Sequence, residues 1–206
     1  METTVFLIRH GVTDWHRDRR LVGQREVPLN GDGVSQSKAV AQGLANVPIG
    51  EIISSPMLRA VQTAEIIAHQ FKADITRDPR LTDLRFGKWE GMTYDEVAQT
   101  ADYQRIKAHP MTERLPGGED LTQVRDRAIH SVEQALRDAP AGESLAIVSH
   151  ATVLRIVLAH YTGSDVAQFY RFRLTPGSVS VLSFRDDRDP PRVLAVGWRA
   201  NLTEVL

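Results

Sequence analysis

The sequence predicts an α/β fold, a three-layer sandwich in which a mainly parallel sheet has helices on both faces and a small helical cap over its carboxyl edge. The apolar run at residues 5–8 does not alternate with polar residues, so it indicates a strand that is covered on both faces. Such runs alternate along the chain with segments of helical periodicity. That order favours right-handed crossovers between parallel strands.

Strands and helices are expected in turn over most of the chain. The strands are expected over five short runs: residues 3–8, 51–54, 144–148, 179–184 and 192–197. The helices are expected over four longer segments: residues 31–45, 57–71, 120–138 and 151–161. A chain of 206 residues can bury most of its apolar surface in one core, so residues 1–206 are predicted to form a single domain.

The two helices of the first half have recognisable start signals. After a loop rich in Arg and Gly, Asn30 is suited to cap the helix over 31–45. Ser55 and Pro56 are favoured as the cap and the first-turn residue of the helix over 57–71. That second helix carries an apolar stripe that is expected to face the core: Leu58, Val61, Ala64, Ile67 and Phe71.

The second half begins with an irregular segment and continues with the longest predicted helix. Thr93 and Glu96 have the spacing of a capping box, which indicates a short helix within a cap insertion at about 92–118. The charged stretch over 185–191 is expected to be an exposed turn between the last two strands. The helix over 120–138 carries an apolar stripe at helical spacing: Leu121, Val124, Ala128, Val132 and Ala135.

The composition excludes several classes of protein. A formal net charge of −1 argues against nucleic-acid binding, and no apolar run approaches the length of a membrane span. The chain has no Cys, which excludes disulfides, thiolate nucleophiles and Cys-ligated metal sites. We therefore expect a cytoplasmic protein with neither a nucleic-acid nor a membrane partner. The sequence leaves the oligomeric state open, with a homodimer among the alternatives.

Basic and imidazole side chains follow three of the predicted strands. Arg9 and His10 end the first strand, Arg59 lies in the first helical turn after the second, and His150 follows the strand over 144–148. Taken singly, each has a plain structural explanation. Because the carboxyl ends of parallel strands share one edge of a sheet, these groups are expected to converge and to hold an anion between them. An imidazole there can attack phosphorus, and guanidinium groups suit phosphate oxygens.

Six blocks of the sequence together resemble the histidine phosphatase superfamily, the phosphoglycerate-mutase-like fold. They cover almost the whole chain and occur in the family's order. The blocks are Arg-His-Gly-Val-Thr-Asp-Trp at 9–15, Gly-Gln through Pro-Leu-Asn over 23–30, Ser-Ser-Pro-Met-Leu-Arg-Ala-Val-Gln-Thr-Ala at 54–64, Leu-Thr-Asp-Leu-Arg-Phe-Gly-Lys-Trp-Glu-Gly at 81–91, Pro-Gly-Gly-Glu at 116–119 and Val-Ser-His at 148–150.

The resemblance implies a role for each of the converging groups. His10 would be the nucleophile that becomes phosphohistidine, and Arg9, Arg59 and His150 would hold the phosphoryl oxygens. The acid that protonates the leaving oxygen would be Asp83, although most phosphatases of the family have the longer Glu there. Glu90 is the alternative acid, and the resemblance gives it a structural role.

The first blocks also depart from the family pattern. Val12 stands where many members have Glu, and His16 stands where they often have a phosphate-holding Asn. His16 is expected either to replace that Asn as a donor or to lie on the loop surface. The rim from His16 through Gly23 and Gln24, together with the cap, is expected to determine the substrate. Candidate contacts in the cap are Tyr94, Tyr103, Arg105 and His109.

The predicted activity is that of a metal-independent phosphomonoester hydrolase that acts on a small phosphorylated metabolite and needs no cofactor. Only 24 residues, over 92–115, separate Gly91 from Pro116, and this short cap favours hydrolysis over a mutase that must exclude water. Two alternatives remain at this stage. One is mutase-type phosphoryl transfer, and the other is a binding module that keeps the pocket without turnover.

Overall fold

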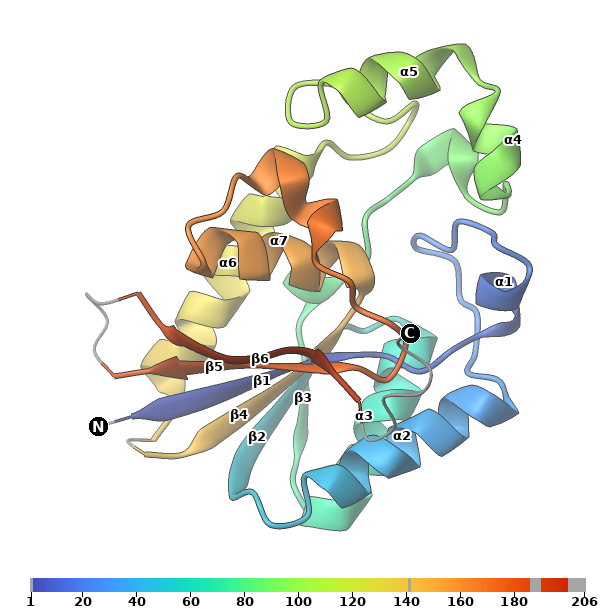
Figure 1. Ribbon diagram of the computed structural model, residues 1–206. Helices are drawn as coiled ribbons and strands as arrows, with labels where there is room; N and C mark the ends of the chain where they lie inside the picture. The colour runs from blue at the N-terminus through green and yellow to red at the C-terminus, as the bar shows by residue number, and fades with distance from the viewer. Residues whose placement is uncertain (1, 141, 186–189, 200–206) are drawn as a thin grey trace.

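One mixed sheet forms the centre of the computed structural model, which describes residues 2–140, 142–185 and 190–199 (Figure 1). The strand order is β3-β2-β4-β1-β5-β6. The pairs β3–β2, β2–β4 and β4–β1 are parallel. The pairs β1–β5 and β5–β6 are antiparallel. The described strands are β1 (Thr3–Arg9), β2 (Ile49–Ser54), β3 (Ile75–Arg77), β4 (Ser144–Ser149), β5 (Val179–Phe184) and β6 (Arg192–Trp198).

Helices cover both faces of this sheet, so the predicted three-layer sandwich is confirmed. α2 (Gly31–Gly43) and α3 (Leu58–Phe71) lie on one face, and α6 (Leu121–Asp138) and α7 (Ala151–Tyr161) lie on the other (Figure 1). The shorter helices and 3₁₀ turns are α1 (Asp14–Arg17), η1 (Pro79–Leu81), η2 (Gly87–Trp89), α4 (Tyr94–Ala98), α5 (Ala101–Ala108) and η3 (Val166–Arg171).

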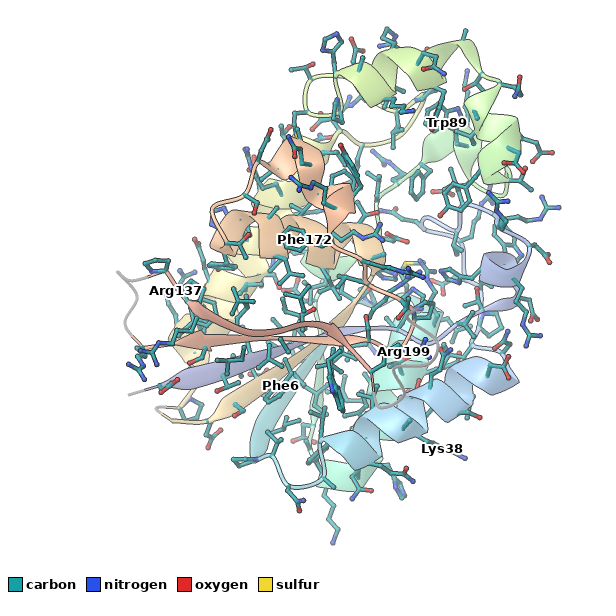
Figure 2. The ribbon with its side chains drawn as sticks, viewed as in Figure 1. Phe6, Lys38, Trp89, Arg137, Phe172 and Arg199 are labelled. Carbon is teal, nitrogen blue, oxygen red and sulfur yellow. The ribbon has the colours of Figure 1, made fainter. Side chains whose placement is uncertain are left out.

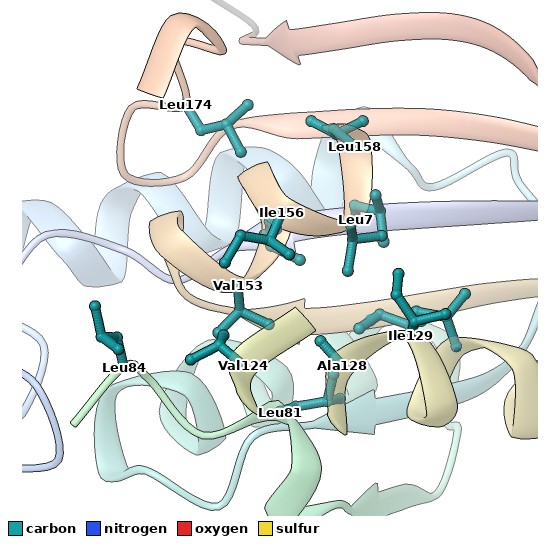
Figure 3. Close-up of a cluster of buried hydrophobic side chains, with 14 of the residues drawn as sticks. Leu7, Leu81, Leu84, Val124, Ala128, Ile129, Val153, Ile156, Leu158 and Leu174 are labelled. Atoms are coloured by element: carbon teal, nitrogen blue, oxygen red, sulfur yellow. The ribbon is translucent and has the colours of Figure 1, made fainter. Parts of the chain in front are cut away.

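The first strand is buried on both faces, as its unbroken apolar run predicts. Val5 and Leu7 join the core under α6 and α7, while Phe6 and Ile8 join the core under α2 and α3. Successive side chains of a strand point to opposite faces, so one strand supplies both layers. Figure 3 shows the larger cluster, in which Leu7 lies among side chains of α6 and α7.

The helix caps agree with the sequence at two starts and differ at one. The side chains of Asn30 and Thr93 accept hydrogen bonds from the backbone of their first turns, as predicted. Asp120, the first residue of the predicted helix over 120–138, is the cap of α6. The predicted cap at Ser55 is wrong, because α3 begins at Leu58 and the Ser55 hydroxyl accepts only from Met57 N, at 3.3 Å. The Ser55 hydroxyl instead lies 2.8 Å from Nε2 of His150, in the site described below.

Several other details differ from the sequence-based expectation. Leu58 was expected in the core stripe, but it is 37% exposed because it lies at the very start of α3. The edge strand β3 and the single-turn helix α1 were not predicted, since both are too short to show periodicity. Of the predicted turn over 185–191, residues 186–189 lie outside the described part of the chain.

Helices α4 and α5 lie beyond the carboxyl edge of the sheet, in the predicted cap segment (Figure 1). The cap is tied to the body through the backbone, by an antiparallel bridge between Arg20 and Thr93. The cap therefore lies on the side of the sheet where the carboxyl ends of β1, β2 and β4 are found. Within the described residues, no helix has the length and apolar character needed to cross a membrane.

Replacing Leu7 by Ala should lower the free energy of unfolding by about 3 kcal/mol, because this side chain is 1% exposed in the centre of the sheet. The same truncation at Leu194 of β6, which is 59% exposed, should change it by less than about 0.5 kcal/mol. Urea denaturation of both variants measures the difference. Equal losses would contradict the assignment of the core.

Candidate active site

Three buried side chains meet at the carboxyl ends of the parallel strands. His10 follows β1, Arg59 lies in the first turn of α3 after β2, and His150 follows β4; each is no more than 1% exposed. The ring centroids of His10 and His150 are 5.0 Å apart. The convergence expected from the topology is therefore present in the structure.

Arg59 is hydrogen-bonded to His10, to Asp83 and to the loop over 23–25. Its Nη2 donates to Gly23 O at 2.7 Å and to Asp83 Oδ2 at 3.0 Å, and its Nη1 donates to Arg25 O at 3.1 Å. Its Nε donates to Nε2 of His10 at 3.3 Å. A fully buried guanidinium needs such partners, because an uncompensated buried charge is costly.

The hydrogen bonds of His10 fix which ring nitrogen carries the proton and which carries the lone pair. Nδ1 lies 2.7 Å from Gly11 O, which can only accept, so the proton is assigned to Nδ1. Nε2 then has the lone pair, in agreement with the N–H that it receives from Arg59. Burial, followed by the neighbouring Arg59, holds the pKa of His10 well below its usual 6.5. The imidazole is therefore neutral and nucleophilic at neutral pH.

Asp83 is the carboxyl group of this cluster, and it is 9% exposed. Oδ2 lies 3.0 Å from Arg59 Nη2 and 3.6 Å from His150 Nδ1, while Oδ1 accepts from Leu84 N. Burial raises the pKa of Asp83, against the lowering effect of Arg59. A carboxyl group that is held protonated more readily than usual, next to a neutral imidazole, suits an acid–base role.

His150 is held through the hydroxyl of Ser55. Nε2 of His150 lies 2.8 Å from Ser55 Oγ, and this hydroxyl already accepts from Met57 N. The hydroxyl hydrogen is thus available to Nε2, an arrangement that leaves the proton on Nδ1. Nδ1 is buried and has no hydrogen-bond partner, so it is a free donor at the site. Burial, followed by Arg59, also holds the pKa of His150 well below 6.5.

Arg9 supplies a second guanidinium at the edge of the cluster. Its Nη1 donates to Leu174 O at 2.5 Å, and its buried Nε has no partner. Burial, followed by repulsion from Arg155, lowers the pKa of Arg9 to about 10, so the group stays charged at neutral pH. The free N–H groups of Arg9 and His150 are donors that a phosphoryl oxygen would satisfy.

Of the two alternatives for His16, the structure favours the one inside the site. The centroid of its ring is 5.3 Å from that of His10, and its Nδ1 lies 2.7 Å from Thr13 Oγ1. Burial, followed by Arg9 and Arg59, lowers its pKa from 6.5 to about 3. The short helix α1 turns this side chain toward His10.

Glycine is required at two positions of the site. Gly23 has φ +55°, and a Cβ there would lie 2.6 Å from Glu90 Oε1; its carbonyl accepts from Arg59. Gly11 packs against the start of α2, where a Cβ would lie 2.4 Å from Gly33 O. Gly11 is therefore required by the packing of α2 on the strand end.

Gln24 and Glu90 support the loops around the site. Gln24 Nε2 donates to Asp83 O at 3.1 Å, and Glu90 accepts from Gln24 N and pairs with Arg25. The Glu90 carboxylate is engaged by these contacts, and no interaction joins it to His10. Asp83 is the carboxyl group that the structure places beside Arg59 and His150.

Arg127 of α6 was not identified from the sequence. Its Nη1 donates to Arg80 O and Thr82 O, both at 2.6 Å, and its Nη2 donates to Asp83 O at 3.2 Å. It also pairs with Glu119, the last residue of the Pro-Gly-Gly-Glu block. Arg127 therefore positions the backbone of Asp83. Its position in the helix that follows the Pro-Gly-Gly-Glu block, eight residues after Glu119, was the available signal.

Of the four cap residues proposed from the sequence, two have other side-chain contacts and two are exposed. Tyr103 packs against Trp89, Arg105 pairs with Asp102 and Glu113, and His109 is exposed at the end of α5. Tyr94 is 53% exposed and lies at the start of α4. In the described residues, no three His, Asp or Glu side chains are grouped so that they could hold a metal ion.

The fold and this cluster define an α/β protein with buried histidine and arginine side chains gathered at the carboxyl edge of its sheet. Residues 5–198 match the histidine phosphatase superfamily, branch 1. The chain therefore belongs to that superfamily, and the resemblance based on six sequence blocks is confirmed.

Three of the proteins that the chain resembles match it over most of its length. The chain is 33% identical over 196 residues to a probable phosphoglycerate mutase, GpmB, of Salmonella choleraesuis strain SC-B67, covering 94% of this chain and 89% of that one. It resembles Bacillus stearothermophilus YhfR with a TM-score of 0.85 and 29% identity, over 95% and 96% of the two chains. It also resembles the mycobacterial glucosyl-3-phosphoglycerate phosphatase Rv2419c with a TM-score of 0.85 and 23% identity, over 98% and 100%.

Replacing His16 by Asn should make the protein less sensitive to acid. The pKa of His16 is about 3 in the folded protein and about 6.5 when unfolded, so at pH 5 only the unfolded chain binds this proton. Stability therefore falls as the pH falls below 6.5. From about pH 6 to pH 5 the variant should lose about 1 kcal/mol less than the wild type in urea titrations. Equal losses would show that His16 is not held neutral.

Proposed function

We propose that the protein is a phosphomonoester hydrolase that acts through a phosphohistidine at His10. The observation that carries the proposal is the orientation of this imidazole. Gly11 O holds the proton on Nδ1, and Arg59 lies against Nε2, the nitrogen with the lone pair. A neutral imidazole with its lone pair on a defined nitrogen, beside two guanidinium groups, suits attack on a phosphate dianion.

In the first step, Nε2 of His10 attacks phosphorus. The N–P bond forms as the P–O bond to the leaving group breaks, and Arg9, Arg59 and the Nδ1 proton of His150 stabilise the three phosphoryl oxygens. Asp83 gives its proton to the leaving oxygen, so the alcohol departs uncharged. Burial raises the pKa of Asp83, which supports this role as an acid.

In the second step, water replaces the alcohol. The Asp83 carboxylate takes a proton from the water as its oxygen attacks phosphorus, and the N–P bond breaks with its electron pair returning to Nε2. Inorganic phosphate then leaves, and Asp83 is protonated again. Both steps use the same groups, and neither requires a metal or an organic cofactor.

Mutase-type phosphoryl transfer is the second candidate, and the 33% identity to a probable phosphoglycerate mutase favours it. The short cap segment supports hydrolysis instead, because its two described helices, α4 and α5, contain only five and eight residues. Rv2419c, a phosphatase of similar fold, has been solved in complex with VO3. Incubation with 3-phosphoglycerate separates the candidates, since a hydrolase releases inorganic phosphate and a mutase forms 2-phosphoglycerate.

Replacing His10 by Ala should abolish hydrolysis of p-nitrophenyl phosphate, with kcat falling by at least about 1,000-fold, because no other group supplies the nucleophile. Replacing His69, an exposed histidine of α3, by Ala is the matched control and should leave kcat unchanged. Colorimetric initial rates measure both. Full activity in the His10→Ala protein would reject the proposal.

Replacing Asp83 by Asn should harm only substrates with poor leaving groups. An alkyl phosphate needs a proton on the departing oxygen, so its kcat should fall by roughly 100-fold or more. A nitrophenolate leaves without that proton, so phosphoenzyme formation from p-nitrophenyl phosphate should change far less. Burst kinetics isolate this first step. Equal effects on the two substrates would exclude Asp83 as the acid.

A further inference from the structure

A cavity of about 450 Å³ lies between the cap and the 3₁₀ helix η3. Sites for small molecules commonly have volumes of about 300–1,000 Å³, so the cavity is large enough for one. The cap helix α5 contributes Tyr103 and Ile106 to its lining, and η3 contributes Ala167, Phe169 and Tyr170. Tyr170 is 63% exposed, so the cavity is open to solvent on this side.

Aromatic side chains dominate the lining of this cavity. The ring centroids of Trp89 and Tyr103 are 6.5 Å apart, and the rings of Phe169 and Tyr170 meet edge to face. Trp89 is labelled in Figure 2, among the cap helices. Aromatic rings offer a large apolar surface and favour the stacking of a further ring against them. The lining therefore favours a ligand that is itself aromatic.

The charged side chains of the lining already have partners within the protein. They are three carboxylates and one ammonium group: Glu113, Glu119, Asp120 and Lys107. Arg105 pairs with the first and Arg127 with the second, while Asp120 caps α6. The ammonium group of Lys107 lies 5.8 Å from the centroid of the Tyr103 ring. A charged ligand would enter the cavity without a counter-ion, which is costly, so a neutral ligand is favoured.

The cavity and the catalytic cluster lie on different sides of the loop that carries Asp83. Leu84 lines the cavity and belongs to the hydrophobic cluster under α6 and α7 (Figure 3). The carboxyl group of the preceding residue, Asp83, instead faces Arg59 and His150. None of these three residues, nor His10, is part of the lining. The cavity is therefore separate from the phosphate site.

Hydrogen bonds connect the wall of the cavity to Asp83. Leu84 N donates to Asp83 Oδ1 at 2.9 Å. Glu119 accepts from Arg127 Nε at 3.1 Å, and Arg127 Nη2 donates to Asp83 O at 3.2 Å. Glu119 also accepts from Arg85 N at 3.0 Å. A molecule in contact with Leu84 and Glu119 therefore acts on the position of Asp83 through directly bonded neighbours.

We propose that this cavity binds a small neutral aromatic molecule, an effector distinct from the phosphorylated substrate, and that its binding slows proton transfer from Asp83. The carboxyl group already accepts hydrogen bonds from Arg59 and Leu84. New contacts on the cavity side shift it from this position, and a proton donor must stay within hydrogen-bond reach of the leaving oxygen. The binding needs no catalysis, whereas its effect on Asp83 rests on the proposed function.

The binding test uses two fluorescent probes that differ by one charged group. N-phenyl-1-naphthylamine is neutral, and 8-anilinonaphthalene-1-sulfonate is the same molecule with a sulfonate. Both become brighter in apolar surroundings, so titration of the wild-type protein gives the dissociation constant of each. The neutral probe should bind at least about tenfold more tightly, which corresponds to about 1.4 kcal/mol.

Two variants locate the bound probe. Ala167→Trp fills the cavity and should weaken binding of the neutral probe by at least about tenfold. Tyr170→Ala removes one exposed ring and should weaken it by about threefold. Ala45→Trp is the matched control, because Ala45 is exposed just after α2 and lies outside the lining; it should bind as the wild type does. Thermal melts check that each variant is folded.

Steady-state kinetics test the effect on Asp83. At saturation, the neutral probe should lower kcat on an alkyl phosphate that the wild-type protein hydrolyses by at least about threefold, with KM unchanged. The burst of phosphoenzyme formation from p-nitrophenyl phosphate should not change, since that leaving group needs no proton. In Ala167→Trp the probe should leave kcat on the alkyl phosphate unchanged.

Failure of this inference is distinguishable from failure of the proposed function. No binding of the neutral probe, equal or tighter binding of the sulfonate, or full binding in both Ala167→Trp and Tyr170→Ala would overturn the site. An unchanged kcat, or a raised KM that places the probe in the phosphate site, would overturn the effect on Asp83. The hydrolytic function is judged separately, from the rate of the wild-type protein on p-nitrophenyl phosphate without any probe.

Discussion

The buried guanidinium of Arg59 is the constraint on which the rest of the site depends. It has no exposed surface, and its donors reach three separate segments of the chain, at His10, at Gly23 and Arg25, and at Asp83. A charge in such a place must be surrounded by acceptors, or the folded state would lose several kcal/mol. The left-handed turn at Gly23 and the inward position of the Asp83 loop both follow from this requirement. Arg127 holds the Asp83 loop through the backbone carbonyl of Asp83, while Arg59 pairs with the carboxyl group.

This arrangement also sets the protonation of its neighbours. Arg59 and burial together keep the imidazoles of His10 and His150 neutral, while burial keeps a proton on Asp83 more readily than in water. These are the protonation states that the proposed first step requires of His10 and Asp83. The unpartnered N–H groups of Arg9 and His150 remain as donors for an anion.

Much of this could be predicted from the sequence because strand ends are easy to locate. His10 and His150 directly follow apolar runs, and Arg59 follows a short one, so parallel topology alone brings them together. The direction of His16 could not be predicted, since it depends on the single turn of α1. The prediction that Ser55 caps α3 was wrong because a serine before a proline has the pattern of a helix cap. In the structure its hydroxyl lies 2.8 Å from Nε2 of His150. Arg127 lies within a helix, where its spacing resembles that of ordinary surface residues, and only its tertiary contacts distinguish it.

The most direct test of this account is to identify the atom that carries the phosphoryl group. The wild-type protein is mixed with p-nitrophenyl phosphate, quenched in alkali, in which phosphohistidine survives, and examined by peptide mass spectrometry and ³¹P NMR. The hydrogen bond between Nδ1 and Gly11 O predicts a single phosphorylated residue, His10, modified at Nε2. Turnover accompanied by phosphate on Nδ1, on another residue, or on none would contradict the account.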